Sequence, residues 1–156
     1  MGVKGLLQLF KSIMQPTHLS QFKNKRIGID MYSWLYRGTA TCAKDLALGK
    51  APKGHLHYCI RFLQKLKDFG IIPICVFDGD ILPLKQYEEQ NRDIRRIQCL
   101  DDAVKCEYMG DKKQAQKLYH QAVKIVPDDV YELIQMIKSE YKDDPIECVI
   151  SPYQVC

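Results

Sequence analysis

Three short apolar runs, separated by longer segments with helical patterns, constrain the fold of this 156-residue chain more than any other feature. They read "KRIGID", "IIPICVF" and "IECVIS". Consecutive strands joined through helices need crossover connections, and such connections favour parallel pairing. The sequence therefore predicts an α/β fold built on a parallel sheet with flanking helices. The second run is continuous and rich in β-branched residues, so we expect a strand buried on both faces.

Apolar residues at helical spacing mark the segments between these runs. Pro16, Gly70 and Gly110 are expected to end three of the helices. The expected helices cover residues 6–14, about 32–48, 56–70 and 85 to about 109, then a segment that carries Ala115, Leu118, Ala122 and Ile125, and a last helix that begins at Pro127.

The composition limits the partners and metals that the chain is expected to bind. A formal net charge of +4 and a pI near 8.6 fit contact with nucleic acid, although many proteins without such a partner are as basic. Seven cysteines without a C-x-x-C pair suit reduced thiols and argue against zinc. His55 and His57 fall on different helix faces, which favours surface and core roles over a metal site. No apolar run reaches the roughly 20 residues that span a bilayer, so we expect a soluble protein with no membrane partner.

An aspartate stands at the end of each of the first two runs, Asp30 and Asp78. Ligands of open parallel sheets collect at the carboxyl ends of the strands, so we expect both carboxylates at one edge of the sheet. An N-cap or turn role for each aspartate is an equally supported alternative. Convergent carboxylates suit Mg²⁺ or Mn²⁺ and phosphate chemistry. Two are too few for a pair of ions about 4 Å apart, and after the third run "SPYQVC" offers only Gln154.

Several motifs in a fixed order resemble one known family. They are "MGVKGLLQLF", "IGIDMYSWLYRG", "PICVFDGDILPLK", the charged helix through "NRDIRR" and "VISPY". Together they resemble the N-terminal region of the flap endonuclease (XPG) superfamily, and "YSWLYRG" and "DILPLK" are most similar to its exonuclease 1 branch. The resemblance implies a PIN-like 5′-nuclease fold with a helical arch, of which this chain would form the N-terminal half. It implies a structure-specific 5′ nuclease of DNA repair, a 5′-to-3′ exonuclease or flap endonuclease that hydrolyses DNA phosphodiesters with two Mg²⁺ ions, or Mn²⁺ in their place.

The resemblance also assigns roles to individual residues. Asp30 and Asp78 match metal ligands of the family. Lys85 and Arg92 match a basic pair of the helical gateway that stabilises the scissile phosphate, and their spacing of seven fits one helix face. The DNA-binding candidates are Gly2, Tyr32, Tyr36, Arg95 and Arg96; Gly2 belongs to an amino-terminal segment that packs beside the active site in the family.

Other roles for these residues stay open at this point. Without the resemblance, the acids Glu88, Glu89 and Asp93 favour a solvated helix of mixed charge over a gateway. Trp34 lies at helical spacing between two tyrosines and is expected to pack in the core. Tyr36 stands where the exonuclease 1 branch commonly has histidine, which weakens the comparison of its contact with DNA.

We expect one globular unit with three regions. Residues 1–99 form the N-terminal nuclease region, residues 85–125 form the gateway and arch within it, and residues 126–156 begin the internal nuclease region. After "PY" the family continues with Glu-Ala-Asp-Ala and later a helix-hairpin-helix motif, where this sequence has Gln-Val-Cys. We hypothesise that the sequence runs past an unspliced exon boundary, with a degenerate gene or a shortened isoform as alternatives. The chain alone is then expected to be inactive and to expose apolar surface.

The expected partner is DNA with 5′ ends, nicks or flaps, and the expected location is the nucleus. Mismatch-repair proteins or a sliding clamp would bind through a C-terminal region beyond this sequence. The alternative function is a catalytically inactive DNA-binding fragment or degenerate paralogue, which would bind DNA in a salt-dependent way without cutting it. A tetratricopeptide-like module ranks last, because "GDKKQAQKLYHQAVKIVPD" resembles one repeat helix and no second copy follows.

Overall fold

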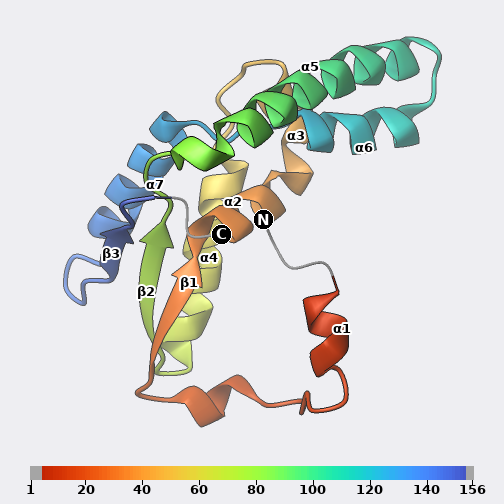
Figure 1. The fold of residues 1–156 in the computed structure, drawn as a ribbon. Helices are drawn as coiled ribbons and strands as arrows, with labels where there is room; N and C mark the ends of the chain where they lie inside the picture. Colours follow the sequence, from red (N-terminus) through yellow and green to blue (C-terminus); the bar gives the residue numbers. More distant parts are fainter. Residues whose placement is uncertain (1–4, 154–156) are drawn as a thin grey trace.

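The computed structural model describes residues 5–153 and is built on a three-stranded parallel sheet (Figure 1). The strands lie in the order β1-β2-β3, with parallel pairing at both junctions. This arrangement confirms the predicted α/β fold. The predictions that concern Gly2 and Gln154 lie outside the described residues. The strands are β1 (Arg26–Asp30), β2 (Ile72–Phe77) and β3 (Glu147–Ile150).

Helices connect the strands and cover the sheet. The predicted helices after residue 50 are confirmed, and the predicted break at Gly110 separates α5 from α6. Within residues 5–153, no helix combines the length and the apolar character that crossing a membrane requires. The α-helices are α1 (Leu6–Phe10), α2 (Met31–Gly38), α3 (Ala43–Ala47), α4 (Gly54–Asp68), α5 (Gln86–Tyr108), α6 (Lys112–Ala122) and α7 (Pro127–Glu140), and the 3₁₀ turns are η1 (Leu19–Phe22), η2 (Thr39–Thr41) and η3 (Pro83–Lys85).

The core joins β1 and β2 to the helices α2, α4 and α7, and it continues into α5 and α6 through Ala103, Ala115 and Tyr119. Leu56 and Leu63 of α4 and Leu133 and Ile137 of α7 are fully buried, as the apolar spacing along both helices predicts. Gly70 follows α4 with a φ of 70°, a left-handed conformation that favours glycine and reverses the chain into β2. The helices therefore hold the carboxyl ends of β1 and β2 in fixed positions.

The two faces of β2 differ in burial. Pro73, Cys75 and Phe77 are buried on one face, whereas Ile72 on the other is 48% exposed. The contacts of α2 and α4 with β2 account for the covered face (Figure 1). The predicted burial of this strand on both faces is therefore wrong, because among the described residues helices cover one side of the strand and the other stays accessible.

The first predicted helix is shorter than its sequence pattern. The helix α1 ends at Phe10, well before Pro16, and Leu9 is 76% exposed. A helix of five residues gains little from its own hydrogen bonds, and helices of this length depend on tertiary packing to extend. The exposure of Leu9, Ile13 and Met14 shows that residues 5–153 provide little such packing here, so the expected helix over residues 6–14 is wrong in length.

The predicted helix over residues 32–48 is divided into α2, η2 and α3. The backbone of α2 comes so close to α4 at Gly38 that a Cβ there would lie 2.8 Å from the Cα of His55. Directly afterwards the hydroxyl of Thr39 donates a hydrogen bond of 2.8 Å to the carbonyl of Tyr36. A side chain that satisfies a helix carbonyl competes with the helical hydrogen bond, and the chain changes direction at this point.

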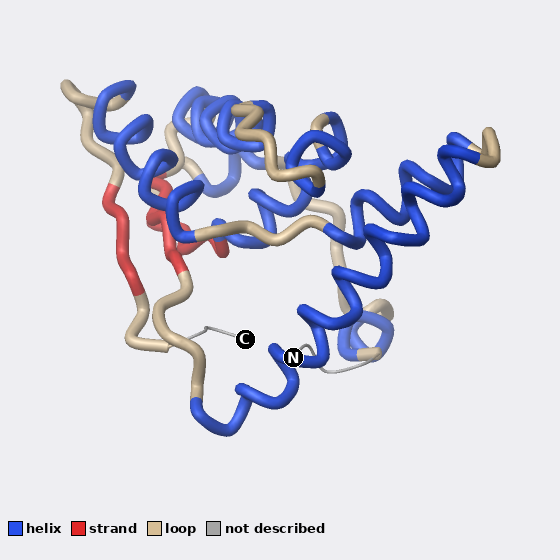
Figure 2. The backbone as a smooth tube through the Cα atoms, turned by 90° about the horizontal axis from the view of Figure 1, so that it is seen from above, coloured by secondary structure: helices blue, strands red, loops and turns tan. Residues whose placement is uncertain are grey.

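A hairpin of α5 and α6 projects from the body of the protein, and both views show it extending beyond the sheet (Figures 1 and 2). Gly110 allows the turn with a φ of 87°. The carboxylate of Asp111 then accepts a hydrogen bond of 3.0 Å from the backbone N–H of Gln114 and caps α6. Since α5 starts close to the carboxyl end of β2, its first turns lie beside Asp78 while its far end extends away (Figure 1).

Candidate functional site

The carboxyl end of the parallel sheet carries the two aspartates that the sequence singles out. Asp30 is the last residue of β1 and pairs in register with Val76, and Asp78 follows the last residue of β2. Both therefore lie at the same end of the sheet. Among residues 5–153, however, no three His, Cys, Asp or Glu side chains come together as a group that could hold a metal ion.

Asp30 forms the N-cap of α2. Its carboxylate accepts a hydrogen bond of 3.2 Å from the backbone N–H of Ser33 and one of 2.7 Å from the Ser33 hydroxyl. The capping role considered from the sequence is thus present. A carboxylate has about four lone-pair positions, so these two bonds leave acceptor capacity on both oxygens for a further ligand. The side chain is exposed, which keeps that capacity accessible.

Asp78 lines a pocket of about 360 Å³ between the sheet end, α2 and α5. Tyr32 and Tyr36 of α2 and Arg92 and Arg96 of α5 contribute to its walls, and Asp30 does not. Burial raises the pKa of Tyr32, and the negative charge of Asp78 raises it further. Tyr32 therefore stays a neutral phenol at physiological pH and can donate a hydrogen bond into the pocket.

The loop after Asp78 is fixed by a close backbone approach. A Cβ at Gly79 would lie 1.9 Å from the carbonyl oxygen of Ser151, a distance at which only a glycine fits. Asp80 forms a parallel bridge with Tyr153 in the same region. The chain after β3 thus packs on the loop that carries Asp78 and limits the positions open to this aspartate.

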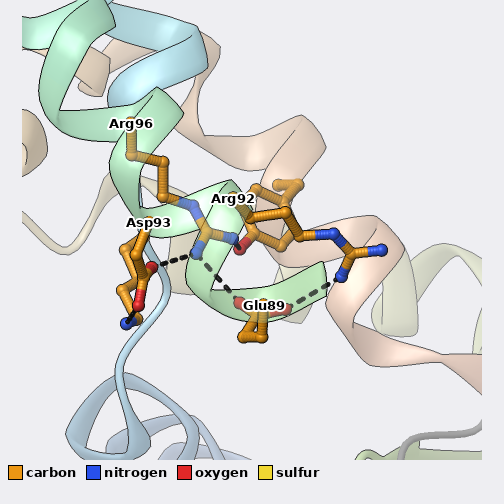
Figure 3. Close-up of polar contacts among 6 residues, drawn as sticks. Glu89, Arg92, Asp93 and Arg96 are labelled. Carbon is orange, nitrogen blue, oxygen red and sulfur yellow. Dashed lines mark hydrogen bonds and ion pairs between the residues drawn. The ribbon is translucent and has the colours of Figure 1, made fainter. Parts of the chain in front are cut away.

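The basic residues of α5 form an ion-pair network beside the pocket (Figure 3). Glu89 accepts a hydrogen bond of 3.0 Å from Nη1 of Arg92 and another of 3.0 Å from Nη1 of Arg96. Arg96 also donates to Asp93 at 2.6 Å and, through Nη2, to the phenol oxygen of Tyr36 at 3.3 Å. This last contact links α5 to α2, so the arginine holds two walls of the pocket together.

Opposing effects set the ionisation of this network. Burial alone would lower the pKa of Arg96, but its hydrogen bonds to Asp93 and Glu89 raise that pKa above the usual range. The pKa of Asp93 is lowered, mainly by the hydrogen bond that Lys124 donates to it at 2.7 Å. Arg96 and Asp93 are therefore both charged at physiological pH.

Three arginines of α5 lie around a second hollow. Arg92, Arg95 and Arg96, with Cys99 and Gln121, line a pocket of about 380 Å³ between α5 and α6. The structure thus brings together the three arginines that the sequence singles out. Lys85 lines neither hollow; it is the last residue of η3 and directly precedes α5. The sequence places Lys85 and Arg92 on one face of the same α-helix. In the structure Arg92 belongs to α5, whereas Lys85 belongs to the 3₁₀ turn that precedes it.

Trp34 packs against the core, and His55 is buried. Trp34 packs against Phe62 of α4 with ring centroids 5.7 Å apart, in agreement with the predicted core role. His55 is fully buried, and its Nε2 lies 3.2 Å from Oδ1 of Asp129. Burial would raise the pKa of Asp129, but its hydrogen bonds with His55 and the Val126 backbone lower it overall. His55 is therefore a core histidine with a carboxylate partner.

The sequence interpretation missed the part that acids play in this site. The alternative without the family resemblance treats Glu88, Glu89 and Asp93 as part of a solvated helix of mixed charge, yet the side chain of Glu89 is only 16% exposed and carries two ion pairs. The spacing of three from Glu89 to Arg92 could have indicated one of these pairs. Lys124 gave no local signal, because its partner lies 31 residues earlier in the chain.

Comparisons with known proteins show the family to which the sequence is similar. The XPG N-terminal domain family matches residues 1–99. The chain is 37% identical over 154 residues to exonuclease 1 of Arabidopsis thaliana and 34% identical to exodeoxyribonuclease 1 of Schizosaccharomyces pombe. Each alignment covers 99% of this chain but only 20% and 26% of those proteins.

Solved structures support the fold independently of these sequence matches. The catalytic core of Rad2 in complex with a DNA substrate superposes with a TM-score of 0.63 over 98% of this chain and 40% of that one, at 22% identity. At this identity the superposition supports the fold, whereas the sequence matches show the family. This chain belongs to the XPG N-terminal domain family.

Proposed function

We propose that this chain supplies the N-terminal part of a structure-specific 5′ nuclease of DNA repair, a 5′-to-3′ exonuclease or flap endonuclease. The observation that carries the proposal is the arrangement around Asp78, where a carboxylate at the end of a parallel strand faces a pocket that is also walled by Arg92 and Arg96. Carboxylates and arginines around one hollow suit a phosphodiester, which is anionic and is commonly cleaved with bound metal ions. Relatives named exonuclease 1 and a DNA-bound structural neighbour support the same substrate class.

The carboxylate ligands at the sheet end are of the type that Mg²⁺, or Mn²⁺ in its place, prefers, but they are too few to hold a pair of ions. Asp30 and Asp78 offer hard oxygen ligands at one end of the sheet, whereas a pair of ions needs more ligands than these two residues provide. When bound, such ions would lower the pKa of a water molecule and stabilise the leaving oxygen. In this assignment Asp30 and Asp78 contribute metal ligands.

The basic residues would bind and orient the DNA. Lys85 and Arg92 would stabilise charge on the scissile phosphate, and Arg95 and Arg96 would hold the neighbouring backbone. Tyr32 and Tyr36, which wall the same pocket, would contact the bases or sugars next to the cleaved bond. The proposed substrates are DNA with 5′ ends, nicks or flaps, and the proposed location is the nucleus. Mismatch-repair proteins or a sliding clamp are proposed partners of the longer protein.

Replacing Arg92 with alanine is expected to weaken binding to a duplex with a recessed 5′ end by about tenfold, because one charge-assisted contact is lost. The slope of log K against log salt should become shallower by about 0.9, the amount for one phosphate contact. Fluorescence anisotropy over a range of salt concentrations measures both quantities. Arg61, an exposed arginine of α4, is the control, and Arg61→Ala should leave the slope unchanged. An equal loss in both variants would contradict a defined interface on α5.

The 156-residue chain is expected to bind this DNA without cleaving it in Mg²⁺, since the described residues hold no group of three metal-binding side chains. The measurement is release of labelled nucleotides from recessed 5′ ends, compared between the chain and its Asp78→Ala variant. Binding without cleavage also characterises the second candidate function, an inactive DNA-binding fragment. Cleavage that Asp78→Ala abolishes would show that the two aspartates suffice, and would reject that second candidate.

A further inference from the structure

The carboxylate of Glu89 occupies two arginines of the candidate DNA interface at once. One oxygen binds Arg92 and the other binds Arg96, each at 3.0 Å (Figure 3). Glu89 also lines the same pocket as Asp78, and its side chain is only 16% exposed. Two oxygens shared between two guanidinium groups is the arrangement that a DNA phosphate would adopt at this position. The glutamate therefore fills a phosphate position in the free protein.

The two arginines differ in how firmly they are held. Arg96 has further bonds to Asp93 and Tyr36 and is 18% exposed, so it stays in place without Glu89. Arg92 is 45% exposed, and Glu89 is its only ion-pair partner among residues 5–153. Loss of Glu89 would thus release Arg92 and leave Arg96 anchored. The exchangeable contact of the network is the pair between Glu89 and Arg92.

We propose that Glu89 competes internally with DNA phosphate for Arg92, so that DNA must displace this carboxylate to use the arginine. The proposal rests on the proposed function and deepens it, since it names a residue that sets the affinity of the same interface. In the free protein the arginine is neutralised, which weakens its attraction to isolated backbone phosphates. Once displaced, the carboxylate remains on the same helix turn and repels a phosphate nearby, which lowers affinity further.

The test uses Glu89→Gln in the full 156-residue chain. Glutamine keeps an oxygen that can accept from an arginine, so the shape of the site is retained while the charge is lost. The variant is expected to bind a duplex with a recessed 5′ end about tenfold more tightly, a change that corresponds to about 1.4 kcal/mol. The slope of log K against log salt should change by much less than about 0.9, because Arg92 contacts a phosphate in both complexes and Glu89 changes only the free energy needed to release it.

Glu88→Gln is the matched control. It makes the same change in net charge one residue away, and the side chain of Glu88 has no ion pair or hydrogen bond with any of residues 5–153. Glu88→Gln should raise the DNA affinity only slightly, by the long-range electrostatic effect of removing one negative charge. The gain of Glu89→Gln should also vanish when Arg92 is replaced with alanine in the same chain, because the two residues are coupled. Equal gains in both glutamine variants would reduce the effect to net charge and overturn the proposal.

A second readout separates this proposal from the proposed function. Inorganic pyrophosphate should raise the melting temperature of the Glu89→Gln variant more than that of the unmodified chain, because at the same concentration a ligand that binds the native state more tightly stabilises it more. If the unmodified chain binds no DNA, the proposed function fails, and the pyrophosphate measurement still decides the role of Glu89. If the chain binds DNA but Glu89→Gln binds equally or less tightly, Glu89 positions the arginines rather than competing with phosphate, and the proposal is wrong.

Discussion

Replacing Phe77 with alanine is expected to lower the free energy of unfolding by about 3–5 kcal/mol, the largest effect that we expect of any single substitution in this chain. Phe77 is fully buried and is the last residue of β2, directly before Asp78. Its removal takes a large apolar surface out of the core and leaves a cavity that the sheet and its helices can only partly close. Urea unfolding followed by circular dichroism measures the change as a lower transition midpoint with an unchanged slope.

Ile72→Ala is the control for this prediction, since Ile72 lies on the same strand but is 48% exposed. We expect it to lower the free energy of unfolding by about 1 kcal/mol, because much of the side chain already contacts water. The comparison also tests the assignment of the covered face. If the two substitutions cost the same, the difference in burial between the faces of β2 would not hold in solution.

Local patterns predicted most of the secondary structure because the core follows them. Leu56 and Leu63 of α4 and Leu133 and Ile137 of α7 are buried at the apolar spacing seen in the sequence. The apolar pattern gave wrong predictions where the burial of a side chain depends on another segment that packs against it. Ile13 has the right spacing for a helix but is 71% exposed, since no element of residues 5–153 covers it, and Ile72 lies on the face of β2 that the helices of these residues leave open.

The positions of candidate site residues were predictable only where the order of strands and helices along the chain determines them. Strand ends place Asp30 and Asp78 at one edge of the sheet, and a parallel fold requires this. The contact of Arg96 with Tyr36 joins residues 60 positions apart, and no periodicity indicates which arginine turns toward α2. The double contact of Glu89 was equally hidden, since a sequence shows that charges are near but not which of them pair.

The second large effect is expected at Gly38, where alanine should lower the free energy of unfolding by about 1–3 kcal/mol. In an exposed helix the same change usually stabilises by about 1 kcal/mol, because glycine has the lower helix propensity. Here the sign reverses. The new Cβ would lie 2.8 Å from the Cα and the carbonyl oxygen of His55 and 3.0 Å from the Cβ of Tyr58, so α2 would have to move away from α4.

Such a movement would also reach the candidate site, because α2 carries the tyrosine that accepts a hydrogen bond from Arg96. Thermal and urea unfolding of Gly38→Ala therefore belong with a measurement of DNA affinity, and we expect both stability and affinity to fall. Gly28→Ala is the matched control in β1, where the nearest atom to a new Cβ is a methyl group of Val76 at 3.9 Å, an ordinary contact. That variant should be as stable as the unmodified chain or slightly more stable. A Gly38→Ala protein that gains stability as Gly28→Ala does would show that α2 and α4 are further apart than the structure has them, and that Tyr36 is not held against Arg96 by the packing of these helices.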